Sequence, residues 1–342
     1  MVLTTKERPL GEVVEFVDNK TKGVDIDRDN LLRRIALLFH FSITTGAAAG
    51  LTIIEGDLLN AVKQIFLVMD ADDNKFSINL EKWLFVEHVE KGTIPKRDTF
   101  AIPGVGVTST FDILVNADFA QARQNLSDVS SLLDAPNKAS LKLKVEWGTI
   151  TDVIVTANNT SIDSNTEVRI SLTEVFDDEG AEATAKLAAQ TFNDIREGED
   201  EFLVTKAFGQ FDSATLQEQI NPVPANILTH LLITKEDVTS VTGTPVRAND
   251  IVTDYKIQNI KGNGQIFKQA SWNASHFGDK SEYGLESIFT GVKYIDHIDE
   301  QRGGFPNFVA EANKWRFLTN APVAAETDAI QLYTRYIAGI AQ

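Results

Sequence analysis

The sequence predicts an all-β protein composed of two similar β-sandwich domains that follow each other along the chain. Three observations lead to this fold class: segments in which apolar and polar residues alternate, turn signals between many such segments, and an internal repeat. Alternation with a period of two is typical of a strand that has one face in a core and the other in water. The 342 residues are enough for two domains of ordinary size.

The segment ASLKLKVEWG, residues 139–148, shows the alternation most clearly, because its large apolar members are separated by Lys142, Lys144 and Glu146. Comparable strand-like runs are predicted along the whole chain, over residues 33–45, 61–69, 107–116, 139–147, 165–176, 226–234, 250–260, 289–298, 313–319 and 328–338. Polar turn signals such as Gly-Asn-Gly at 262–264 separate these runs.

Helical patterns are few and short, and we expect them in the connections between strands. They cover residues Leu80 to Glu90, Asp118 to Leu133, Ala181 to Ile195 and a shorter stretch from Gln269 to Phe277. Many short strands with a few connecting helices indicate sandwiches or jelly rolls and disfavour βαβ units.

An internal repeat divides the chain into two halves of similar organisation. The segments from Asn60 to Trp83 and from Asn249 to Trp272 each contain a strand, a polar turn, a second strand and a tryptophan. Further segments correspond in the same order: 35–45 with 225–235, 108–116 with 289–297, 141–148 with 314–321, and 167–176 with 329–338. The repeat predicts two similar β-domains, with their junction between residues 177 and 209.

The composition disfavours several classes of function. The 49 acidic and 32 basic residues give a net charge of -17, and such a surface repels the phosphates of nucleic acids. The absence of cysteine excludes disulfides, thiolate metal sites and a cysteine nucleophile. No apolar run near the N-terminus is long enough for a signal peptide, so we expect a protein made in a cytoplasm.

One segment carries oxygen ligands at the spacing of a calcium-binding EF-hand loop. The residues at loop positions 1, 3, 5 and 12 are Asp70, Asp72, Asn74 and Glu81. However, Lys75 stands at position 6, where the sharp turn requires glycine, and the repeat aligns this loop with a hairpin turn that lacks carboxylates. We therefore expect a solvated turn and no cofactor, and calcium at these four residues is the alternative.

The sequence offers no constellation typical of catalysis, and we expect no catalytic residue. The histidines, which are His40, His88, His230, His276 and His297, lack metal-binding spacing, and the first and third lie in matching apolar strands as core or interface residues do. Acidic residues on predicted strands, Glu146, Glu167 and Asp112, are single members of solvent faces. This placement disfavours the paired carboxylates of a glycosidase.

The four tryptophans are Trp83, Trp147, Trp272 and Trp315. Two of them occupy equivalent positions in the repeat, so we interpret them as anchors of domain cores or interfaces. A platform on which sugars stack is the alternative interpretation.

Three features of the chain resemble the double jelly-roll major capsid proteins of tailless icosahedral viruses, the tectivirus- and corticovirus-like lineage. The first is the segment 118–148, in which a leucine-rich stretch leads to an alternating strand that ends in Trp-Gly. The others are the paired strand–turn–strand–tryptophan units and the terminal run from 292 to 337. The resemblance covers nearly the whole chain.

The resemblance implies two tandem eight-stranded jelly rolls, over residues 29–195 and 196–342, with a few short connecting helices and an N-terminal arm over residues 1–28. It implies helices near the capsid base before Leu141 and before Trp315. It also implies outer decorations at the loops 157–165, 177–200 and 236–249.

The function implied by the resemblance is that of a structural subunit, without enzymatic activity. Three copies with two similar domains each would form a pseudo-hexagonal capsomer that tiles an icosahedral shell. The partners implied are the homotrimer, neighbouring capsomers, minor capsid or penton proteins and an internal membrane, with no direct contact to nucleic acid. The implied location is the virion capsid, after synthesis in the host cytoplasm.

Three other functions remain open. A carbohydrate-binding or adhesive two-domain β-sandwich protein would need an exposed aromatic platform. A glycoside hydrolase or lyase on a jelly-roll scaffold would need two carboxylates that project from strands into a concave sheet. A calcium-binding structural protein would depend on the segment from Asp70 to Glu81.

Overall fold

The structure, a computed structural model, describes residues 3–46, 51–91, 97–119, 132–155, 159–177, 194–211, 219–220, 226–238, 245–259, 266–285, 289–296, 313–322 and 326–338. Contacts divide the chain into two units. The first comprises Met1–Glu87 and Pro95–Ile195, and the second comprises His88–Ile94 and Arg196–Gln342. The main break lies between Ile195 and Arg196.

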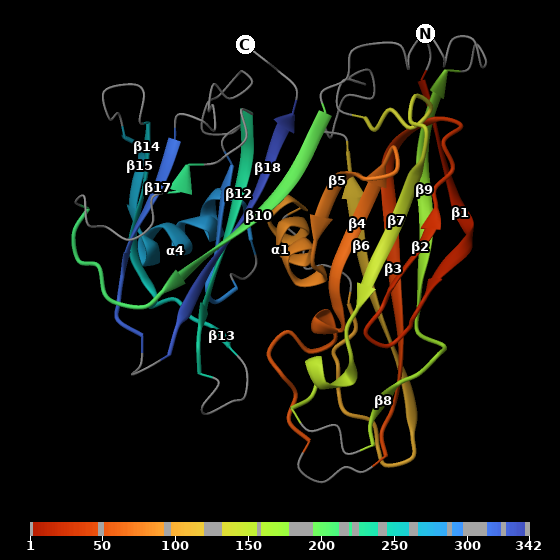
Figure 1. Cartoon of the computed structure of the whole chain (residues 1–342), viewed down its shortest axis with the longest axis horizontal. Helices are drawn as coiled ribbons and strands as arrows, with labels where there is room; N and C mark the ends of the chain where they lie inside the picture. The colour runs from red at the N-terminus through yellow and green to blue at the C-terminus, as the bar shows by residue number, and fades with distance from the viewer. Residues whose placement is uncertain are drawn as a thin grey trace. The chain divides into compact units, whose positions relative to one another are not determined.

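Two antiparallel sheets form the first domain (Figure 1). One sheet has the spatial order β1 (Leu3–Glu15), β9 (Glu167–Asp177), β3 (Leu31–Thr44) and β6 (Thr108–Asp118), and β8 (Ser161–Ile162) also pairs with β3. The other has the order β2 (Thr21–Asp25), β7 (Leu141–Trp147), β4 (Val62–Met69) and β5 (Asp73–Ile78). In β7, buried residues alternate with half-buried ones, as the sequence predicts.

The second domain repeats this arrangement. One sheet has the order β10 (Asp194–Val204), β18 (Asp328–Ala338), β12 (Asn226–Glu236) and β16 (Val292–Asp296), and β13 (Val246–Arg247) also pairs with β12. The other has the order β11 (Gln219–Ile220), β17 (Asn313–Thr319), β14 (Val252–Asn259) and β15 (Ile266–Ser271). Counted along each domain without the short strands β8 and β13, the eight strands are arranged identically.

This strand order is that of the jelly roll, in which the chain passes repeatedly from one sheet to the other. Each main pair of segments in the predicted repeat corresponds to a pair of equivalent strands: β3 with β12, β4 with β14, β6 with β16, β7 with β17 and β9 with β18. The prediction of two tandem eight-stranded jelly rolls is confirmed.

One helix follows the fourth strand of the second sheet in each domain. The first, α1 (Leu80–Lys91), lies where the sequence predicts it. The second, α4 (Trp272–Glu282), begins later than the predicted stretch from Gln269, because Gln269 to Ser271 still belong to β15. Ser271 then caps the helix, its hydroxyl accepting a hydrogen bond from the Ala274 N–H at 3.4 Å.

The tryptophans of the repeat are not equivalent within these helices. Trp83 is the fourth residue of α1, whereas Trp272 is the first residue of α4. Both tryptophans are nevertheless buried. The Trp83 ring meets the Phe76 ring of the preceding strand edge-on at 5.1 Å, and Trp272 is fully buried in the core of the second domain. The tryptophans therefore anchor the helices from different turns.

Of the two other predicted helices, one lies mostly outside the described residues and the other is wrong at its end. Most of the helix predicted from Asp118 to Leu133 falls outside the described residues, as does the segment that precedes β17. The helix predicted up to Ile195 is wrong at its end, because β10 begins at Asp194. For the same reason residues 194–200 are part of a sheet and not of the predicted outer loop from 177 to 200.

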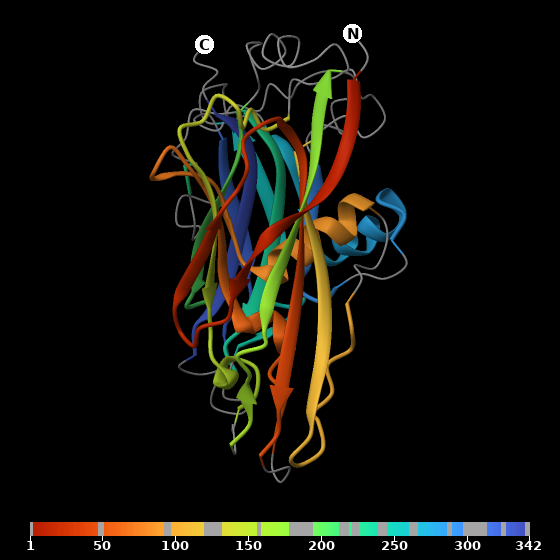
Figure 2. The ribbon, with the colours of Figure 1, turned by 90° about the vertical axis from the view of Figure 1, so that its right-hand side faces the viewer.

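The predicted N-terminal arm is also wrong. Residues 3–15 form β1, which pairs with β9 from Leu3↔Asp177 to Glu15↔Glu167, and residues 21–25 form β2, which pairs with β7. Figure 2 shows β1 running beside β9. This segment therefore supplies one strand to each sheet of the first domain.

Aromatic side chains fill the space between the two sheets of each domain. In the first domain Trp147 is fully buried and meets the rings of Phe16, Phe39 and Phe41 edge-on. In the second domain Trp315, near the start of β17, has this role from the other end of the equivalent strand and stacks on Phe317. In the part of the chain that the structure describes, no helix is long and apolar enough to cross a membrane.

Candidate functional site

The residues proposed to bind calcium lie on and around a β-hairpin. Asp70 and Ala71 form the turn between β4 and β5 with positive φ angles of 49° and 82°. One Asp70 carboxylate oxygen accepts a hydrogen bond from the Ala139 N–H at 2.6 Å, and the other lies 3.9 Å from the Lys138 Nζ. The Asp70 carboxylate therefore attaches the hairpin to the segment that leads into β7.

The other three candidates are separated from Asp70 by the course of the chain. Asp72 is exposed in the turn, Asn74 is exposed on β5, and Glu81 is buried in the first turn of α1, beyond the far end of β5. Where an EF-hand would have a helix before its loop, this chain has the strand β4. Among the described residues, no three acidic, histidine or cysteine side chains gather as a metal site would require.

We predict that Asp70→Ala lowers the free energy of unfolding of the first domain by about 1–2 kcal/mol, because the Ala139 N–H loses its acceptor. We also predict that saturating calcium leaves the melting temperatures of the unmodified protein and of Asp70→Ala unchanged. Thermal unfolding followed by circular dichroism tests both, with Asp72→Ala as the control for an exposed carboxylate. A calcium-induced rise in the melting temperature that Asp70→Ala abolishes would establish the calcium site.

All four tryptophans are buried. Their exposed fractions are 6% for Trp83, 0% for Trp147, 0% for Trp272 and 3% for Trp315. Sugar-binding platforms require the face of an exposed ring, so these residues supply no such platform. Their burial matches our first interpretation, in which they anchor the cores.

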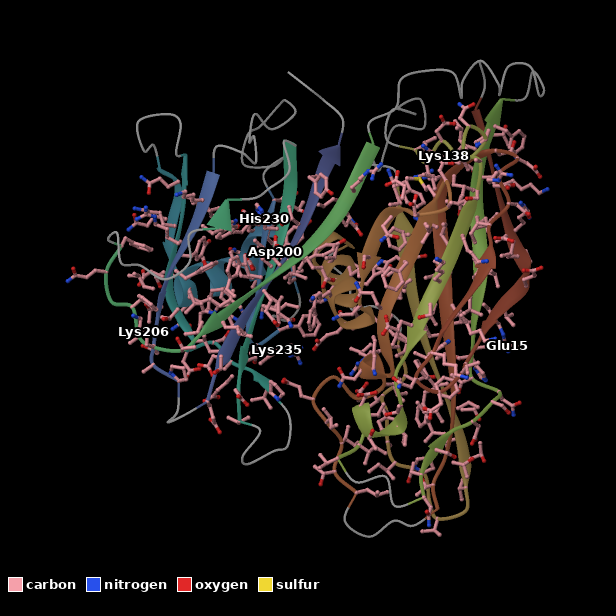
Figure 3. The ribbon with its side chains drawn as sticks, viewed as in Figure 1. Glu15, Lys138, Asp200, Lys206, His230 and Lys235 are labelled. Atoms are coloured by element: carbon pink, nitrogen blue, oxygen red, sulfur yellow. The ribbon has the colours of Figure 1, made fainter. Side chains whose placement is uncertain are left out.

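The histidines occupy separate positions in the fold. His230, labelled in Figure 3, is fully buried and meets Trp315 edge-on at 5.0 Å, as expected for a core residue. His40 instead lies on the outer face of its sheet, with Nδ1 2.7 Å from Asp112 Oδ1. His88 and His276 are buried, and His297 lies outside the described residues.

The acidic residues on strands do not form a catalytic pair in one concave sheet. Asp112 and Glu167 flank His40 on the two strands that neighbour β3. Glu167 forms an ion pair with Arg169 at 2.6 Å, and Glu146 belongs to the other sheet of the domain. This row of charges on an outer face is typical of a polar surface.

Each domain attaches its helix to the next strand through a buried carboxylate, an arrangement that sequence reasoning missed. In the first domain, Glu87 on α1 accepts hydrogen bonds from the backbone N–H of Asn116 at 3.1 Å and from its side-chain amide at 2.6 Å. In the second domain, Asp279 on α4 accepts from the Tyr294 N–H at 3.3 Å and pairs with Lys293. Glu87 and Asp279 are each the eighth residue of their helix.

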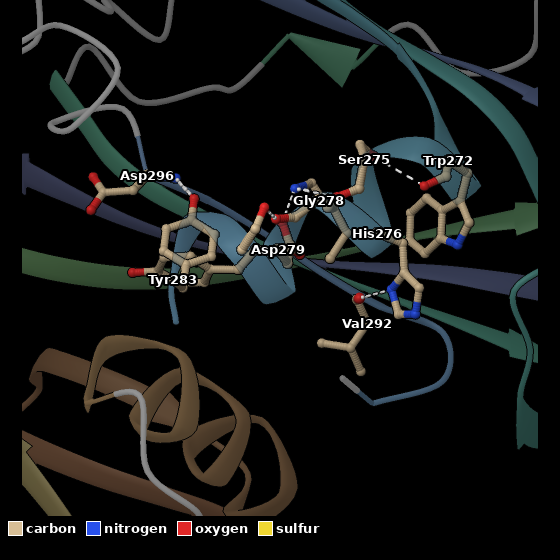
Figure 4. Close-up of polar contacts among 11 residues, drawn as sticks. Trp272, Ser275, His276, Gly278, Asp279, Tyr283, Val292 and Asp296 are labelled. Carbon is tan, nitrogen blue, oxygen red and sulfur yellow. Dashed lines mark hydrogen bonds and ion pairs between the residues drawn. The ribbon is translucent and has the colours of Figure 1, made fainter. Parts of the chain in front are cut away.

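The pair in the second domain belongs to a wider buried network (Figure 4). The side chains of Lys293 and Asp279 are only 1% and 5% exposed. Lys293 Nζ also donates to the Ser275 carbonyl at 3.2 Å, and the Tyr283 hydroxyl accepts from the Asp296 N–H at 3.2 Å. Burial lowers the pKa of Lys293 and raises the pKa of Asp279, and the opposite charge of each partner counteracts these shifts. This network fixes α4 to β16.

A group of acidic residues lies at the end of β12 and the start of β18. Burial raises the pKa of Asp328, and the negative charges of Asp237, Asp250 and Glu326 raise it further. Burial and the charges of Asp250, Asp328 and Glu326 act in the same direction on the pKa of Glu236. Ionisation of Asp328 and of Glu236 therefore costs more free energy in the folded second domain than in water.

We predict that Asp328→Asn raises the stability of the second domain at pH 7 and has no such effect near pH 3. A carboxylate whose pKa is higher in the folded state costs stability above that pKa, and the cost disappears below the ordinary Asp value of about 3.9. Asparagine keeps the oxygen that accepts from the Asp237 N–H at 3.0 Å. Urea unfolding at pH 7 and near pH 3 tests the prediction, with Asp72→Asn as the control for an exposed carboxylate. A lower free energy of unfolding for Asp328→Asn at pH 7 would contradict it.

Among the described residues, large apolar side chains are exposed in loops of the first domain and at two places in the second, on α4 and on β10, where Leu203 is 54% exposed. The loops at one end of the first domain expose Ile53, Val105, Val107 and Val155, with exposed fractions between 39% and 60%. In the second domain, Phe277 on α4 is 68% exposed, the highest value among the exposed large apolar residues that the structure describes.

No protein-family model matches the sequence, and no curated protein matches it. Solved structures match it over nearly its whole length. The crystal structure of the MCP of STIV, Sulfolobus turreted icosahedral virus, has a TM-score of 0.71 and 14% identity, covering 98% of this chain and 97% of the other.

Two further structures are similar over comparable lengths. The Faustovirus major capsid protein has a TM-score of 0.61 and 7% identity, with coverage of 98% and 90%. The major capsid protein P2 from bacteriophage PM2 has a TM-score of 0.57 and 9% identity, with coverage of 98% and 99%. These likenesses establish the fold of the chain, two jelly rolls in tandem.

Proposed function

We propose that the chain is the major capsid protein of a tailless icosahedral virus. The observation that carries the proposal is the duplicated jelly roll itself: both domains have the same strand order and the same helix connection. The three solved capsid proteins named above share this fold over 98% of this chain. The function is structural, and we assign no catalytic residue.

The mechanism of such a protein is assembly. Three copies with two similar domains each present six similar edges, so a trimer can occupy a hexagonal position in a shell. Contacts between subunits bury surface, and many weak contacts of this kind hold a closed particle together. The net charge of -17 keeps the free subunit soluble at high concentration and disfavours contact with the genome.

The proposed partners follow from this role. They are two further copies in a homotrimer, neighbouring capsomers, minor capsid or penton proteins and an internal membrane. The proposed location is the virion, after synthesis in the host cytoplasm. The carbohydrate-binding alternative has lost its support, because the four tryptophans that would form its platform are buried.

The mass of the purified protein in solution tests the proposal. Light scattering after size exclusion, with and without EDTA, should give three times the chain mass of 37.7 kDa in both conditions. A monomer that loses stability in EDTA would contradict the proposal and favour the calcium-binding alternative at Asp70 to Glu81. A monomer unaffected by EDTA would contradict self-assembly of the chain alone.

A further inference from the structure

The buried pair of Lys293 and Asp279 brings an amine to a carboxyl group, and these two groups can condense to an amide. In the first domain the carboxylate at the same place on the helix, Glu87, has the side-chain amide of Asn116 as its partner. That partner shows that a neutral hydrogen-bond donor is enough to attach the helix to the next strand. Attachment of α4 therefore does not require a lysine, whose charge is costly to bury.

Hydrogen bonds hold the amine and the carboxyl group in place. Asp279 and Ser275 lie one turn apart on α4 (Figure 4). Lys293 Nζ contacts Asp279 Oδ1 and donates to the Ser275 carbonyl at 3.2 Å, and Asp279 Oδ2 accepts from the Tyr294 N–H at 3.3 Å. The carboxyl carbon is one bond beyond Oδ1, so the amine is held beside the atom that it would attack. Such positioning replaces the encounter of two separate reactants.

The surroundings of the pair favour the neutral forms of both groups. Their side chains are only 1% and 5% exposed, and burial lowers the pKa of Lys293 and raises the pKa of Asp279. The positive charge of Lys268 lowers the pKa of Lys293 further, and the negative charge of Glu282 raises the pKa of Asp279 further. Transfer of one proton from Nζ to Oδ1, along their hydrogen bond, gives a free amine and a carboxylic acid. A desolvated, uncharged lysine is a nucleophile.

We propose that Lys293 and Asp279 condense to an intramolecular amide, which joins β16 covalently to α4. Nζ attacks Cγ and forms the new bond, while the electron pair of the carbonyl moves to Oδ2, beside the N–H of Tyr294. A backbone N–H at this place stabilises the negative charge. The electron pair then returns, the bond between Cγ and Oδ1 breaks, and Oδ1 leaves with its proton and one proton from Nζ. The products are the amide and one water molecule, so no further reactant is needed.

The buried position also preserves the amide once it has formed. Hydrolysis requires water at the carboxyl carbon, and a closed site keeps water away. Freshly folded protein contains the ion pair, and the amide accumulates from it with time. The bond closes the chain between Asp279 and Lys293 and keeps α4 attached to β16 even when the domain unfolds. This property is additional to the proposed function and does not depend on it.

Mass spectrometry of the denatured, unmodified protein tests the inference, because an amide survives denaturation and an ion pair does not. After storage for weeks in its folded state, the protein should be lighter than freshly purified protein by the mass of one water molecule. Trypsin should no longer cleave after Lys293, and fragment spectra should locate the new bond between the side chains of Asp279 and Lys293.

Two lysine variants serve as matched controls. Lys293→Arg keeps a cation beside Asp279 but has no nucleophilic amine, so it should retain its full sequence mass throughout storage. Lys280→Arg changes an exposed lysine on the same helix and should lose one water as the unmodified protein does. Circular dichroism verifies that each variant is folded. If Lys293→Arg does not fold, the mass of the unmodified protein still decides the question.

Two results would overturn the inference. One is a folded, stored protein that keeps its full sequence mass. The other is a loss of water confined to Asp279, as in a succinimide, with Lys293 still cleaved by trypsin. Neither result affects the proposed function, which is tested by the mass of the assembled protein in solution.

Discussion

Replacing Lys293 by alanine lowers the free energy of unfolding of the second domain by about 3–5 kcal/mol, the expected cost of breaking a buried ion pair. The substitution leaves the Asp279 carboxylate buried with no cation beside it, although the hydrogen bond from the Tyr294 N–H remains. It also removes the donor to the Ser275 carbonyl on α4. Urea unfolding followed by the fluorescence of the tryptophans measures the change.

Two matched variants define what the measurement means. Lys280→Ala removes an exposed lysine from the same helix and should change the free energy of unfolding by less than about 0.5 kcal/mol. The double substitution Asp279→Leu with Lys293→Met replaces both charges by apolar groups and should recover most of the loss. If Lys293→Ala cost no more than Lys280→Ala, the attachment of α4 through this pair would be disproved.

The second large effect is expected for Trp147→Ala, which should lower the free energy of unfolding of the first domain by about 3–5 kcal/mol. The indole fills the space between the two sheets, where it meets three phenylalanine rings. Its Nε1 also donates to the carbonyl of Glu15, the last residue of β1, at 3.0 Å. The substitution therefore leaves a cavity and loosens the end of β1.

Hydrogen exchange of the backbone amides together with urea unfolding measures both consequences. The amides of β1 should exchange faster in Trp147→Ala, whereas those of the second domain should keep their rates. Trp147→Phe keeps an aromatic ring but removes the N–H donor. Its free energy of unfolding should therefore fall clearly less than that of Trp147→Ala. Equal exchange rates for β1 in the variant and in the unmodified protein would show that Glu15 is held in place by other contacts.

The central strands of both domains were predictable because each has one face in a core, which imposes alternation on the sequence. The repeat was predictable for the same reason. Equivalent strands have one face in an equivalent core, so their sequences show similar alternation. β1 was missed because it lies at the edge of its sheet. Most of its side chains face water, and Pro9 and Gly11 interrupt its pattern near the irregular pairing with β9. An edge strand needs little apolar sequence, so it resembles a polar arm.

The candidate site was less predictable than the fold. The partners Glu87 and Asn116, and likewise Asp279 and Lys293, are separated along the chain and meet only because each helix packs against the following strand. The one signal was a carboxylate at the eighth position of both helices, and it becomes visible only once the helix starts are known. Phe277 carries no signal, because a single phenylalanine in a helix is usually a core residue.

Asp70, Asp72, Asn74 and Glu81 have the spacing of calcium ligands along the sequence, but the fold does not bring them together around one point. An EF-hand folds its loop between two helices, so its ligands surround one point. Here β4 and β5 form a hairpin, and the extended strand β5 separates Glu81 from the turn. The spacing of ligands along a sequence predicts a site only when the flanking elements are also those of the motif.

Electron microscopy of the purified protein tests the central claim most directly. We predict trimers with a pseudo-hexagonal outline in which six similar lobes alternate between first and second domains, and closed icosahedral shells under conditions that favour assembly. Particles of two lobes that never associate, or open filaments in place of closed trimers, would contradict the claim that this chain is a capsid subunit.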